Sequence, residues 1–407
     1  MLDDVRVLEL SAPETMLAGR MLADLGADVV VVEPPNGAAG RRLAPFLDDA
    51  PGIERSLTWQ ALNYNKRGVT LDPSSPDGKA LMRDLTAKFD VLIEAARAGE
   101  RSPLDAIEFS PRVIRTMIAP FARTGSKSEY ASTDFTVMAA SGAPVMTGDL
   151  DRPPLYFPVP QAMMEAGADA AIATLTALAA RDRDALGQRA DVSARLAAMM
   201  GSFGLAIVPG SGNPEGKRTQ GAMTFAGVQV PSVYECADGY VLITVAFGPV
   251  FGQMTQRLAK WAAEEGCLDQ RIAEISWPTF IADLSARKTS PADLRALIDG
   301  LKSLTQSKTK TELAVASRRL GLLASPVMNM KDVAEYTQYR ERGLFAPVSI
   351  EAGRDLDVPA RFAQFSNYSI EIKRPAPKLS EHTSDIFAAE LGLSKTEIQA
   401  LFVAGEI

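Results

Sequence analysis

The sequence is poor in the side chains that many enzymes use for catalysis and metal binding. Its 407 residues include one histidine and two cysteines. Cys236 and Cys267 cannot complete a tetrahedral zinc site with a single imidazole, and we expect packed free thiols in a reducing compartment. The lone His382 excludes any mechanism that needs two imidazoles. A Ser–His–Asp or Cys–His arrangement would have to use it, but we expect His382 to have a structural role at the start of a helix.

The sequence also lacks an excess of positive charge and a long apolar run. The net charge of -7 provides no basic face for nucleic acid or for an anionic membrane. The most apolar helical stretch, residues 162–180, is interrupted by Glu165 and Asp169, and the first ten residues lack the features of a signal peptide. We therefore expect a cytoplasmic protein with no nucleic-acid and no membrane partner.

The composition that is present is that of a globular protein, with 46% hydrophobic and 23% charged residues. Its length favours two domains. Short apolar runs bounded by turn residues alternate with helical patterns, and Ser75 can cap the second of these helices. The expected strands cover residues 5–10, 27–33, 68–72, 90–96 and 112–121, and the expected helices cover 16–26 and 75–89. This alternation predicts an α/β fold with a doubly wound parallel sheet.

The pattern changes beyond residue 200. A Gly-rich loop is followed by an expected hairpin at 232–245 and by helical patterns from about 249 to 320. We expect a large Rossmann-like domain whose first part covers residues 1–205 and a smaller α+β domain at 225–325. Residues 340–407 are expected to return to the large domain.

Residues 153–183 form the stretch PPLYFPVPQAMMEAGADAAIATLTALAARDR. We interpret it as a strand that leads into a long Ala-rich helix. Met163 lies at the junction, in the part PQAMMEAG.

A βαβ opening with Glu33 at the end of its second strand suggests dinucleotide binding, since such a carboxylate can hold a ribose hydroxyl. The intervening turn reads SAPET and contains no glycine. Its backbone therefore cannot approach a pyrophosphate closely, and a nicotinamide enzyme is disfavoured.

Several strings occur in a characteristic order: VRVLELS, MLADLGADVVVVEPPNG, LNYNKRGVTLD, YASTDFTVMAASG, GQRADVS, SPVMNMKDVAE and APKLSEHTSD. From residue 4 to about residue 395 the chain resembles the class III CoA-transferases. This CaiB/BaiF group includes formyl-CoA transferase, the carnitine-related CoA-transferases and α-methylacyl-CoA racemase. The resemblance implies a large domain built from both chain ends, a smaller domain between them, and two subunits threaded through each other as an interlocked dimer.

The resemblance also implies a reaction. A carboxylate at the strand-to-helix turn attacks a donor thioester and forms an anhydride, which the released thiolate converts into an enzyme-bound CoA thioester. CoA then passes to an acceptor acid. CoA thioesters are thus substrates, and no permanently bound cofactor is expected. Relatives carry a Gly–Asp pair at this turn, and the pair falls on Ala162 and Met163 here.

Glu165 is the low-ranking substitute for this missing nucleophile. It lies two residues beyond Met163, a rotation of roughly 200° on a helix, and Asp169 lies roughly 240° away. The resemblance does not favour a racemase reaction either. The histidine that racemases carry falls on Thr133 here, and Asp134 follows it. A single acid without an imidazole is a poor two-base device.

The CoA site is altered as well. The turn that holds the nucleotide in relatives reads EAARAG here, with Ala95 and Ala96 at two contact positions. The candidate CoA-binding residues that remain are Lys66, Arg67, Arg97, Arg101 and Asp134.

Three hypotheses follow from the resemblance. The first is a non-catalytic subunit of a heteromeric CoA-transferase that acts on a dicarboxylic or aromatic succinate-like acid, with a related catalytic subunit or a second copy of this chain as its partner. The second is a self-sufficient transferase that uses Glu165 or another acid. The third is a binding protein that keeps the fold without catalysis.

Overall fold

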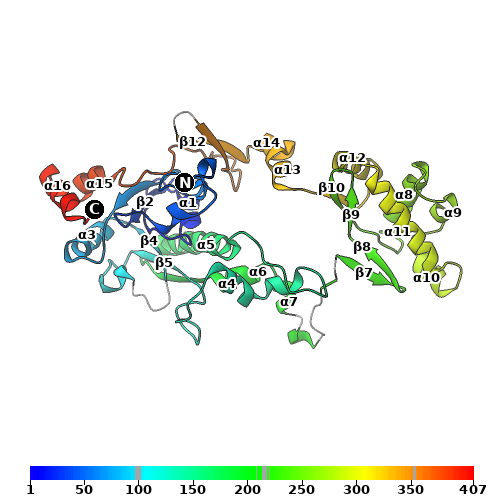
Figure 1. The fold of residues 1–407 in the computed structure, drawn as a ribbon. Helices are drawn as coiled ribbons and strands as arrows, with labels where there is room; N and C mark the ends of the chain where they lie inside the picture. Colours follow the sequence, from blue (N-terminus) through cyan, green and yellow to red (C-terminus); the bar gives the residue numbers. More distant parts are fainter. Residues whose placement is uncertain (97–101, 208, 213–217, 220, 352–353) are drawn as a thin grey trace. The chain divides into compact units, whose positions relative to one another are not determined.

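The protein is described by a computed structural model that covers residues 1–407 apart from 97–101, 208, 213–217, 220 and 352–353. The chain divides into two compact units (Figure 1). The first unit consists of Met1–Thr147, Pro154–Gly216 and Arg340–Ile407. The second consists of Gly148–Pro153 and Lys217–Tyr339. Both chain ends therefore belong to one unit.

A six-stranded sheet forms the centre of the first unit, in the order β3-β2-β1-β4-β5-β6. Every neighbouring pair is parallel. The chain runs outward from β1 in one direction and from β4 in the other, so the order reverses between these two strands. The predicted doubly wound parallel sheet is confirmed. The strands are β1 (Arg6–Leu10), β2 (Asp28–Glu33), β3 (Arg67–Thr70), β4 (Val91–Ala95), β5 (Ile114–Ala119) and β6 (Arg189–Ser193).

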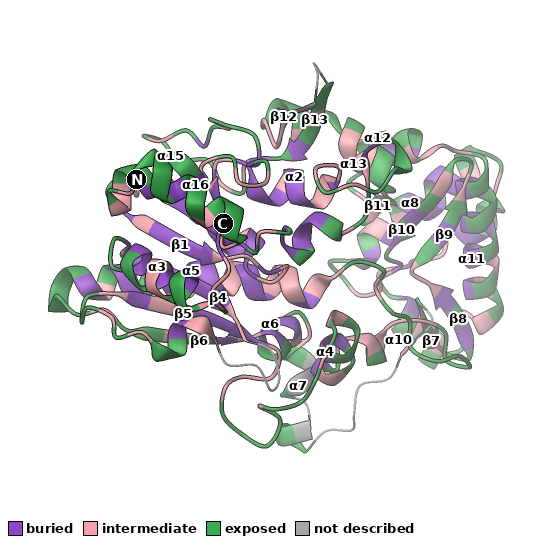
Figure 2. Ribbon diagram, turned by 60° about the vertical axis from the view of Figure 1, so that its left-hand side comes forward, coloured by how far each residue is buried: buried purple, intermediate pink, exposed green. Residues whose placement is uncertain are grey.

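Helices cover both faces of this sheet, which explains why its central strands are nearly continuous apolar runs. Successive residues of β1 enter different cores: Val7 packs in one cluster and Leu8 in another. The cluster of Val7 includes side chains from α1 (Met16–Asp24), α4 (Asp134–Ser141), α5 (Gln161–Asp184) and α6 (Ala194–Met200). The cluster of Leu8 includes side chains from α3 (Pro76–Thr86), α15 (Thr383–Leu391) and α16 (Lys395–Ala404). Figure 2 shows the buried strands between these helices.

The C-terminal segment covers the edge of this sheet at β3. The Gly68 carbonyl accepts from the backbone N–H of His382 at 3.0 Å, and the Gly68 N–H donates to His382 Nδ1 at 3.2 Å. The N–H of Thr70 donates to Thr383 Oγ1 at 3.0 Å. These bonds satisfy backbone groups that an edge strand would otherwise leave free. The hairpin of β12 (Phe345–Glu351) and β13 (Arg354–Pro359) also belongs to this unit and packs on Tyr64, which follows α2 (Leu57–Asn63).

The second unit has its own core. Its three-stranded antiparallel sheet has the order β11-β10-β9, and the predicted hairpin forms β9 and β10. Phe225, Phe247, Trp277 and Phe280 stack within the core. The strands are β7 (Ala222–Phe225), β8 (Val228–Pro231), β9 (Val233–Cys236), β10 (Gly239–Ile243) and β11 (Ala324–Val327), and the helices are α8 (Gly252–Glu264), α9 (Gln270–Ala273), α10 (Phe280–Ser285), α11 (Pro291–Gln306), α12 (Lys310–Leu320) and α13 (Met330–Glu335). The short helix α7 (Phe203–Ala206) belongs to the first unit, and α14 (Thr337–Glu341) crosses the boundary between the units at Tyr339 and Arg340.

One predicted element does not form. Residues 153–160 contain no strand, although α5 does begin at Gln161. This stretch contains Pro153, Pro154, Pro158 and Pro160, which have no N–H group to donate to a sheet ladder. In the described part of the chain, no helix has both the length and the apolar character needed to cross a bilayer.

Candidate functional site

The start of α5 is an unusual helix end. Its N-cap residue is Pro160, which offers no side-chain acceptor, and its first turn contains no acid. The free N–H groups of a helix need an acceptor at this end. Asp134 supplies it from α4, since its Oδ1 accepts from the backbone N–H of Met163 at 2.9 Å. The carboxylate that accepts at the start of α5 therefore belongs to a different helix.

Asp134 is positioned by the start of its own helix. Thr133 caps α4 in a reciprocal arrangement with Thr136, which fixes the backbone on either side of Asp134. Burial raises the pKa of Asp134, and the hydrogen bonds from the amides of Met163 and Ala162 act in the opposite direction. Its Oδ2 is buried and has no hydrogen-bond partner among the described residues.

Met163 and Glu165 have different surroundings. Met163 is half-buried and lines neither the larger cavity described below nor the cavity beside Glu165. Glu165 has a buried Oε2 without a hydrogen-bond partner in the described structure. Burial raises the pKa of Glu165, and the nearby charges of Asp169 and Asp134 raise it further. The charge of Asp134 thus opposes the ionisation of Glu165.

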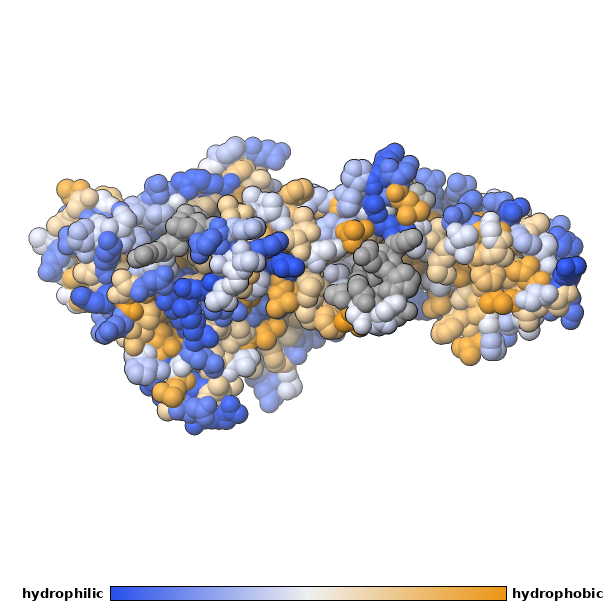
Figure 3. All heavy atoms as spheres, turned by 90° about the horizontal axis from the view of Figure 1, so that it is seen from below, coloured by the Kyte–Doolittle hydropathy of each residue, from blue (hydrophilic) through white to orange (hydrophobic). Residues whose placement is uncertain are grey.

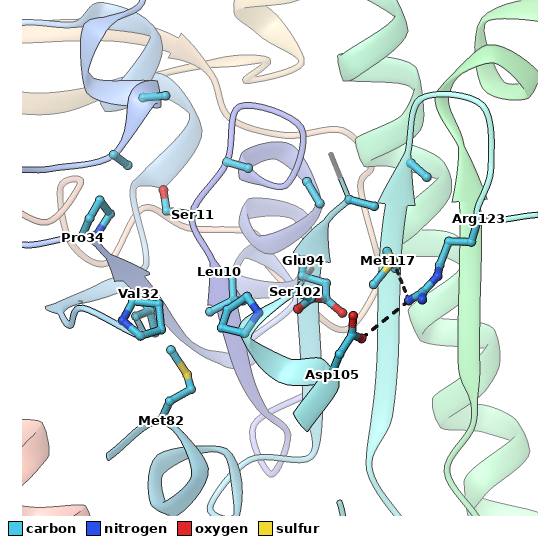
Figure 4. Close-up of a pocket in the computed structure, with 18 of the residues that line it drawn as sticks. Leu10, Ser11, Val32, Pro34, Met82, Glu94, Ser102, Asp105, Met117 and Arg123 are labelled. Carbon is cyan, nitrogen blue, oxygen red and sulfur yellow. Dashed lines mark hydrogen bonds and ion pairs between the residues drawn. The ribbon is translucent and has the colours of Figure 1, made fainter. Parts of the chain in front are cut away.

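The larger cavity lies at the carboxyl ends of the strands, where the strand order reverses between β1 and β4 (Figure 4). Open α/β sheets bind ligands at this place. The volume of the cavity is about 490 Å³. Ala95 and Ala96 line it, as the resemblance implies for the nucleotide-binding turn, together with Ser11 and Pro34.

The ionised side chains around this cavity are mostly acidic. Among its described lining residues, Arg123 is the one cationic side chain, and the acidic ones are Glu33, Glu94, Asp105 and Glu129. Arg123 lies 3.9 Å from Asp105 and donates to the sulfur of Met117 at 3.2 Å. This lining is poorly suited to the phosphates of CoA, which favour cationic side chains.

Other cations neutralise part of this acidic lining. Arg115 pairs with Glu94 and, at 2.7 Å, with Asp105, and Ser102 donates to Glu94. Glu33 is fully buried and paired with Arg41 at 2.6 Å, so it is not free to hold a ribose hydroxyl. Sequence reasoning missed the group of Glu94, Asp105 and Arg123. The sequence contained a signal for this group. Glu94 lies near the carboxyl end of β4, beside Met117 of the adjacent parallel strand β5, and ligands bind at this end of such sheets.

The structure does not place Lys66 where it could bind a phosphate. Its side chain is fully buried and its Nζ donates to Glu9 at 2.6 Å, to the Met16 carbonyl at 2.8 Å and to Asn63 at 2.8 Å. All three hydrogens of the ammonium are thus used inside the fold. The expectation that Lys66 contacts CoA conflicts with this geometry.

Of the other four residues proposed to bind CoA, the two that the structure describes do not share one location. Arg67 forms a two-pronged pair with Asp28, at 2.9 Å and 2.6 Å, and remains partly exposed. Asp134 is occupied at the start of α5. Arg97 and Arg101 lie outside the described residues. The three of these residues that the structure describes, Lys66, Arg67 and Asp134, have separate partners and form no cluster.

The cysteines and the histidine occupy separate places. Cys236 and Cys267 are free and half-buried. His382 is the residue before α15, and its Nδ1 accepts from the Gly68 N–H. Among the described residues, no group of at least three His, Cys, Asp or Glu side chains is arranged to hold a metal ion.

Comparison with known proteins identifies the family. The model of "CoA-transferase family III" matches residues 2–383. The chain belongs to this family, as its sequence resemblance indicated. It is therefore a CoA-transferase by family, and its substrates are CoA thioesters.

The chain is similar to several characterised relatives over its whole length. It is 29% identical to the "Succinyl-CoA:(R)-benzylsuccinate CoA-transferase subunit BbsE" of Thauera aromatica, over 99% of this chain and 97% of the relative. It is 27% identical to the "Succinate--glutarate CoA-transferase" of Agrobacterium fabrum, over 95% of each. A crystal structure of a CAIB/BAIF family protein from Brucella suis matches with a TM-score of 0.77 and 27% identity, over 96% of this chain and 99% of that one.

Proposed function

We propose that this chain is the non-catalytic subunit of a heteromeric class III CoA-transferase that moves CoA between carboxylic acids. The observation that carries the proposal is at the start of α5. The family resemblance places Met163 at the nucleophile's position, and Asp134, the acid at this helix end, accepts a hydrogen bond from the Met163 amide. The partner that provides the missing carboxylate is a related catalytic subunit.

The chemistry requires an oxygen nucleophile. In the transfer, a carboxylate oxygen bonds to the thioester carbonyl carbon and the CoA thiolate leaves, which gives a mixed anhydride. The thiolate then attacks this anhydride and releases the donor acid. The thioether of Met163 can form neither the anhydride nor the enzyme-bound thioester. This chain can therefore supply binding surface and structure but not the covalent step at this position.

Glu165 does not replace the nucleophile in this proposal. It lies roughly 200° around the helix from Met163 and lines a different cavity. Burial and the charges of Asp169 and Asp134 raise the pKa of Glu165, which favours the protonated and less nucleophilic form. Its raised pKa and unpartnered oxygen are the features that favour the second hypothesis, a self-sufficient transferase, and the experiment below distinguishes the two.

The acidic lining of the larger cavity supports weak CoA binding by this chain alone. Arg123 is the single cation among the described lining residues, and it lies close to Asp105. We expect calorimetry to give a dissociation constant above the micromolar range for the isolated chain and tighter binding by the complex. A sub-micromolar constant for the isolated chain would contradict this expectation.

Two observations support a partner subunit. The relative from Thauera aromatica is named as a subunit. In addition, large apolar side chains are exposed on α4, α5 and α6, namely Phe135, Ile172, Leu196 and Met200, each at least 54% exposed. Figure 3 shows apolar residues among polar ones on the surface seen from below. Such exposure is typical of surfaces that another chain covers, and an interlocked dimer is the arrangement we propose.

The acids named for the relatives indicate the substrate class. They are succinate, benzylsuccinate and glutarate, so we propose a dicarboxylic or aromatic succinate-like acid with succinyl-CoA as donor. A cytoplasmic location fits these metabolites, and it remains a prediction.

The test is reconstitution. The chain would be expressed alone and with a related chain that carries an intact Gly–Asp pair, and both preparations would be assayed with succinyl-CoA and candidate acids. We expect turnover by the complex alone, and borohydride trapping of the enzyme-bound thioester on the partner alone. Met163→Leu in the complex is the matched control, and it should keep full activity because Met163 has no chemical role.

Three results would separate the hypotheses. A CoA or acyl adduct on Glu165 would contradict the proposal and favour the self-sufficient enzyme. Turnover by the isolated chain would do the same. A failure of every partner to give turnover, together with ligand binding by this chain, would favour a binding protein without catalysis.

A further inference from the structure

Residues 361–370, with the sequence RFAQFSNYSI, form a loop after β13 that surrounds a cavity of its own. The segment contains no helix and no strand, and every residue that lines the cavity comes from it. The proposed CoA transfer uses none of these residues. We propose that this cavity binds a small oxyanion, the carboxylate or phosphate group of a metabolite, and that Arg361 is its cationic contact.

The loop is held in a closed shape by its own side chains. Arg361 Nε donates to the carbonyl of Ile370 at 3.3 Å, which joins the two ends of the loop. Gln364 Nε2 donates to the carbonyl of Arg342 at 2.8 Å and fixes the middle of the loop to the preceding segment. Ile370 is 4% exposed, so the second end belongs to the packed interior. Compact loops with closed ends frequently carry binding sites.

Most hydrogen-bond donors of this loop are not used by the protein. In the described structure, no backbone N–H of residues 361–370 donates to another protein group. The side chains of Ser366, Asn367 and Ser369 make no hydrogen bond with the described residues either, and the same is true of Arg361 Nη1 and Nη2. Such donors are satisfied by water or by a ligand. A cavity surrounded by them is suited to a group that accepts several hydrogen bonds.

The charge of the lining selects an anionic acceptor. Arg361 is half-buried and is the single charged side chain among the lining residues, none of which is Asp or Glu. A guanidinium group donates two parallel hydrogen bonds to a carboxylate or a phosphate, and these bonds are stronger than those to a neutral acceptor. An uncharged ligand would gain less from this side chain than an oxyanion of the same shape.

Acidic groups outside the cavity do not occupy this cation. Asp3, Asp24 and Glu371 lie near Tyr368. Asp24 is paired with Arg20 at 3.3 Å, and Asp3 is paired with the N-terminal ammonium at 3.1 Å. Glu371 is exposed, so water and salt screen its charge. The guanidinium of the cavity therefore stays available to an anion from solution.

The position of the loop separates this site from the substrate site. The hydroxyl of Tyr368 donates to the carbonyl of Asp24 at 2.9 Å. Asp24 is the last residue of α1, and β2 begins at Asp28, so the loop lies at the amino ends of the strands. The larger cavity lies at their carboxyl ends. The inference is therefore independent of CoA transfer, and it can be tested on the full-length chain without a partner.

The experiment titrates the chain with benzoate, phenyl phosphate and benzamide, the last being an uncharged match for benzoate. The buffer has low ionic strength, because salt screens an accessible site. The backbone amide NMR signals of residues 361–370 report binding at the loop. We expect saturable shifts of these signals with an anion, and roughly tenfold weaker binding of benzamide. Tighter binding of phenyl phosphate would identify a phosphate ligand, and tighter binding of benzoate would identify a carboxylate.

Three variants test the role of Arg361. Arg361→Gln removes the charge and should weaken anion binding by roughly fivefold or more, with little change for benzamide. Arg361→Lys keeps the charge and should restore most of the lost affinity. Arg342→Gln is the matched control, because Arg342 is exposed beside the loop and does not line the cavity. It should change anion affinity by less than about twofold.

An absence of saturable shifts at residues 361–370 with both anions would overturn the proposal. Equal affinities for benzamide and the anions would also overturn it, as would an equal loss in Arg342→Gln and Arg361→Gln, which would show general attraction by surface charge. Thermal unfolding shows whether each variant is folded. If folded Arg361→Lys loses as much affinity as Arg361→Gln, the charge is not the feature that binds, and the assignment of Arg361 is wrong.

Discussion

Asp134 Oδ1 accepts a hydrogen bond from the backbone N–H of Met163 at 2.9 Å, although 29 positions separate the two residues in the sequence. This contact joins α4 to the start of α5. It gives α5 the acceptor that Pro160 cannot provide. It also places a carboxylate at the positive end of a helix whose first turn contains no acid.

The first prediction concerns this contact. Asp134→Ala removes the acceptor and leaves amides at the start of α5 without a partner, so the free energy of unfolding should fall by about 1 to 2 kcal/mol. Asp134→Asn keeps an acceptor oxygen and should lose less than half of that amount. Urea unfolding followed by circular dichroism measures both. Equal losses for the two variants would show that charge, rather than the hydrogen bond, matters here.

The fold was more predictable from the sequence than the site was. Runs such as VVVV in β2 are apolar because both sheet faces are covered, and this pattern is readable without a structure. In contrast, residues 153–160 form a short apolar stretch that suggests a strand, yet their prolines leave the ladder without donors. Apolar character alone does not show whether a neighbouring strand is present.

The positions of single charges were less predictable. Lys66 lies in a polar string and resembles a phosphate ligand, but its ammonium lies inside the core against Glu9, 57 positions away. The capping role of Asp134 likewise depends on where α4 lies relative to α5. Such pairings depend on tertiary contacts across the fold, and the local sequence does not encode them.

A second prediction tests the buried role of Lys66. Both side chains of the Lys66–Glu9 pair are 0% exposed. Lys66→Met leaves an uncompensated carboxyl group in the core and should lower the free energy of unfolding by about 3 to 5 kcal/mol. Arg67→Gln is the matched control, because the Arg67–Asp28 pair is 24% and 38% exposed, and it should lose about 1 kcal/mol or less.

The double variant Lys66→Met with Glu9→Gln should recover part of this stability, since it removes the unpaired charge. Chemical denaturation of the variants gives the comparison. A fully stable Lys66→Met variant with weakened CoA binding would instead support a role in substrate binding.

A third prediction concerns pH. Burial raises the pKa of Asp24 to about 6, against the opposing effects of Arg20 and Asn65. The folded protein therefore binds a proton that the unfolded chain, with an ordinary Asp pKa, has released. Stability should decrease as pH rises from about 4 to about 6, by about 3 kcal/mol in total, and stay level above that. Asp24→Asn should remove this decrease, which denaturant unfolding across the pH range would reveal.

His382 should act in the opposite direction. Burial lowers its pKa, and its Nδ1 needs to be unprotonated to accept from the Gly68 N–H. The unfolded chain binds the proton more readily, so this contribution is lost as pH falls below about 6.5. His382→Gln should lower stability by about 1 to 2 kcal/mol at pH 8 and show a smaller loss on acidification. A reconstituted complex that carries this variant should retain its activity; complete loss of turnover by a folded variant would contradict a structural role.

The last prediction returns to Met163. Met163→Asp introduces an acid at the position where the family resemblance places the nucleophile, but it also places a second carboxylate beside Asp134 at the same helix end. Mutual repulsion and partial burial should raise the pKa of the new group. The described lining of the larger cavity would still offer Arg123 alone as a cation for CoA. We therefore expect the isolated variant to show no CoA transfer above background.

Met163→Asn is the control, because it has the same size and no charge. At pH 8 the aspartate variant should be less stable than the asparagine variant by about 1 to 2 kcal/mol, and the difference should shrink as the pH falls to 5 and the carboxyl group takes up a proton. Thermal or urea unfolding at the two pH values measures this. Robust transfer of CoA by the isolated Met163→Asp variant would show that the rest of the active site is intact and would contradict the proposed dependence on a partner subunit.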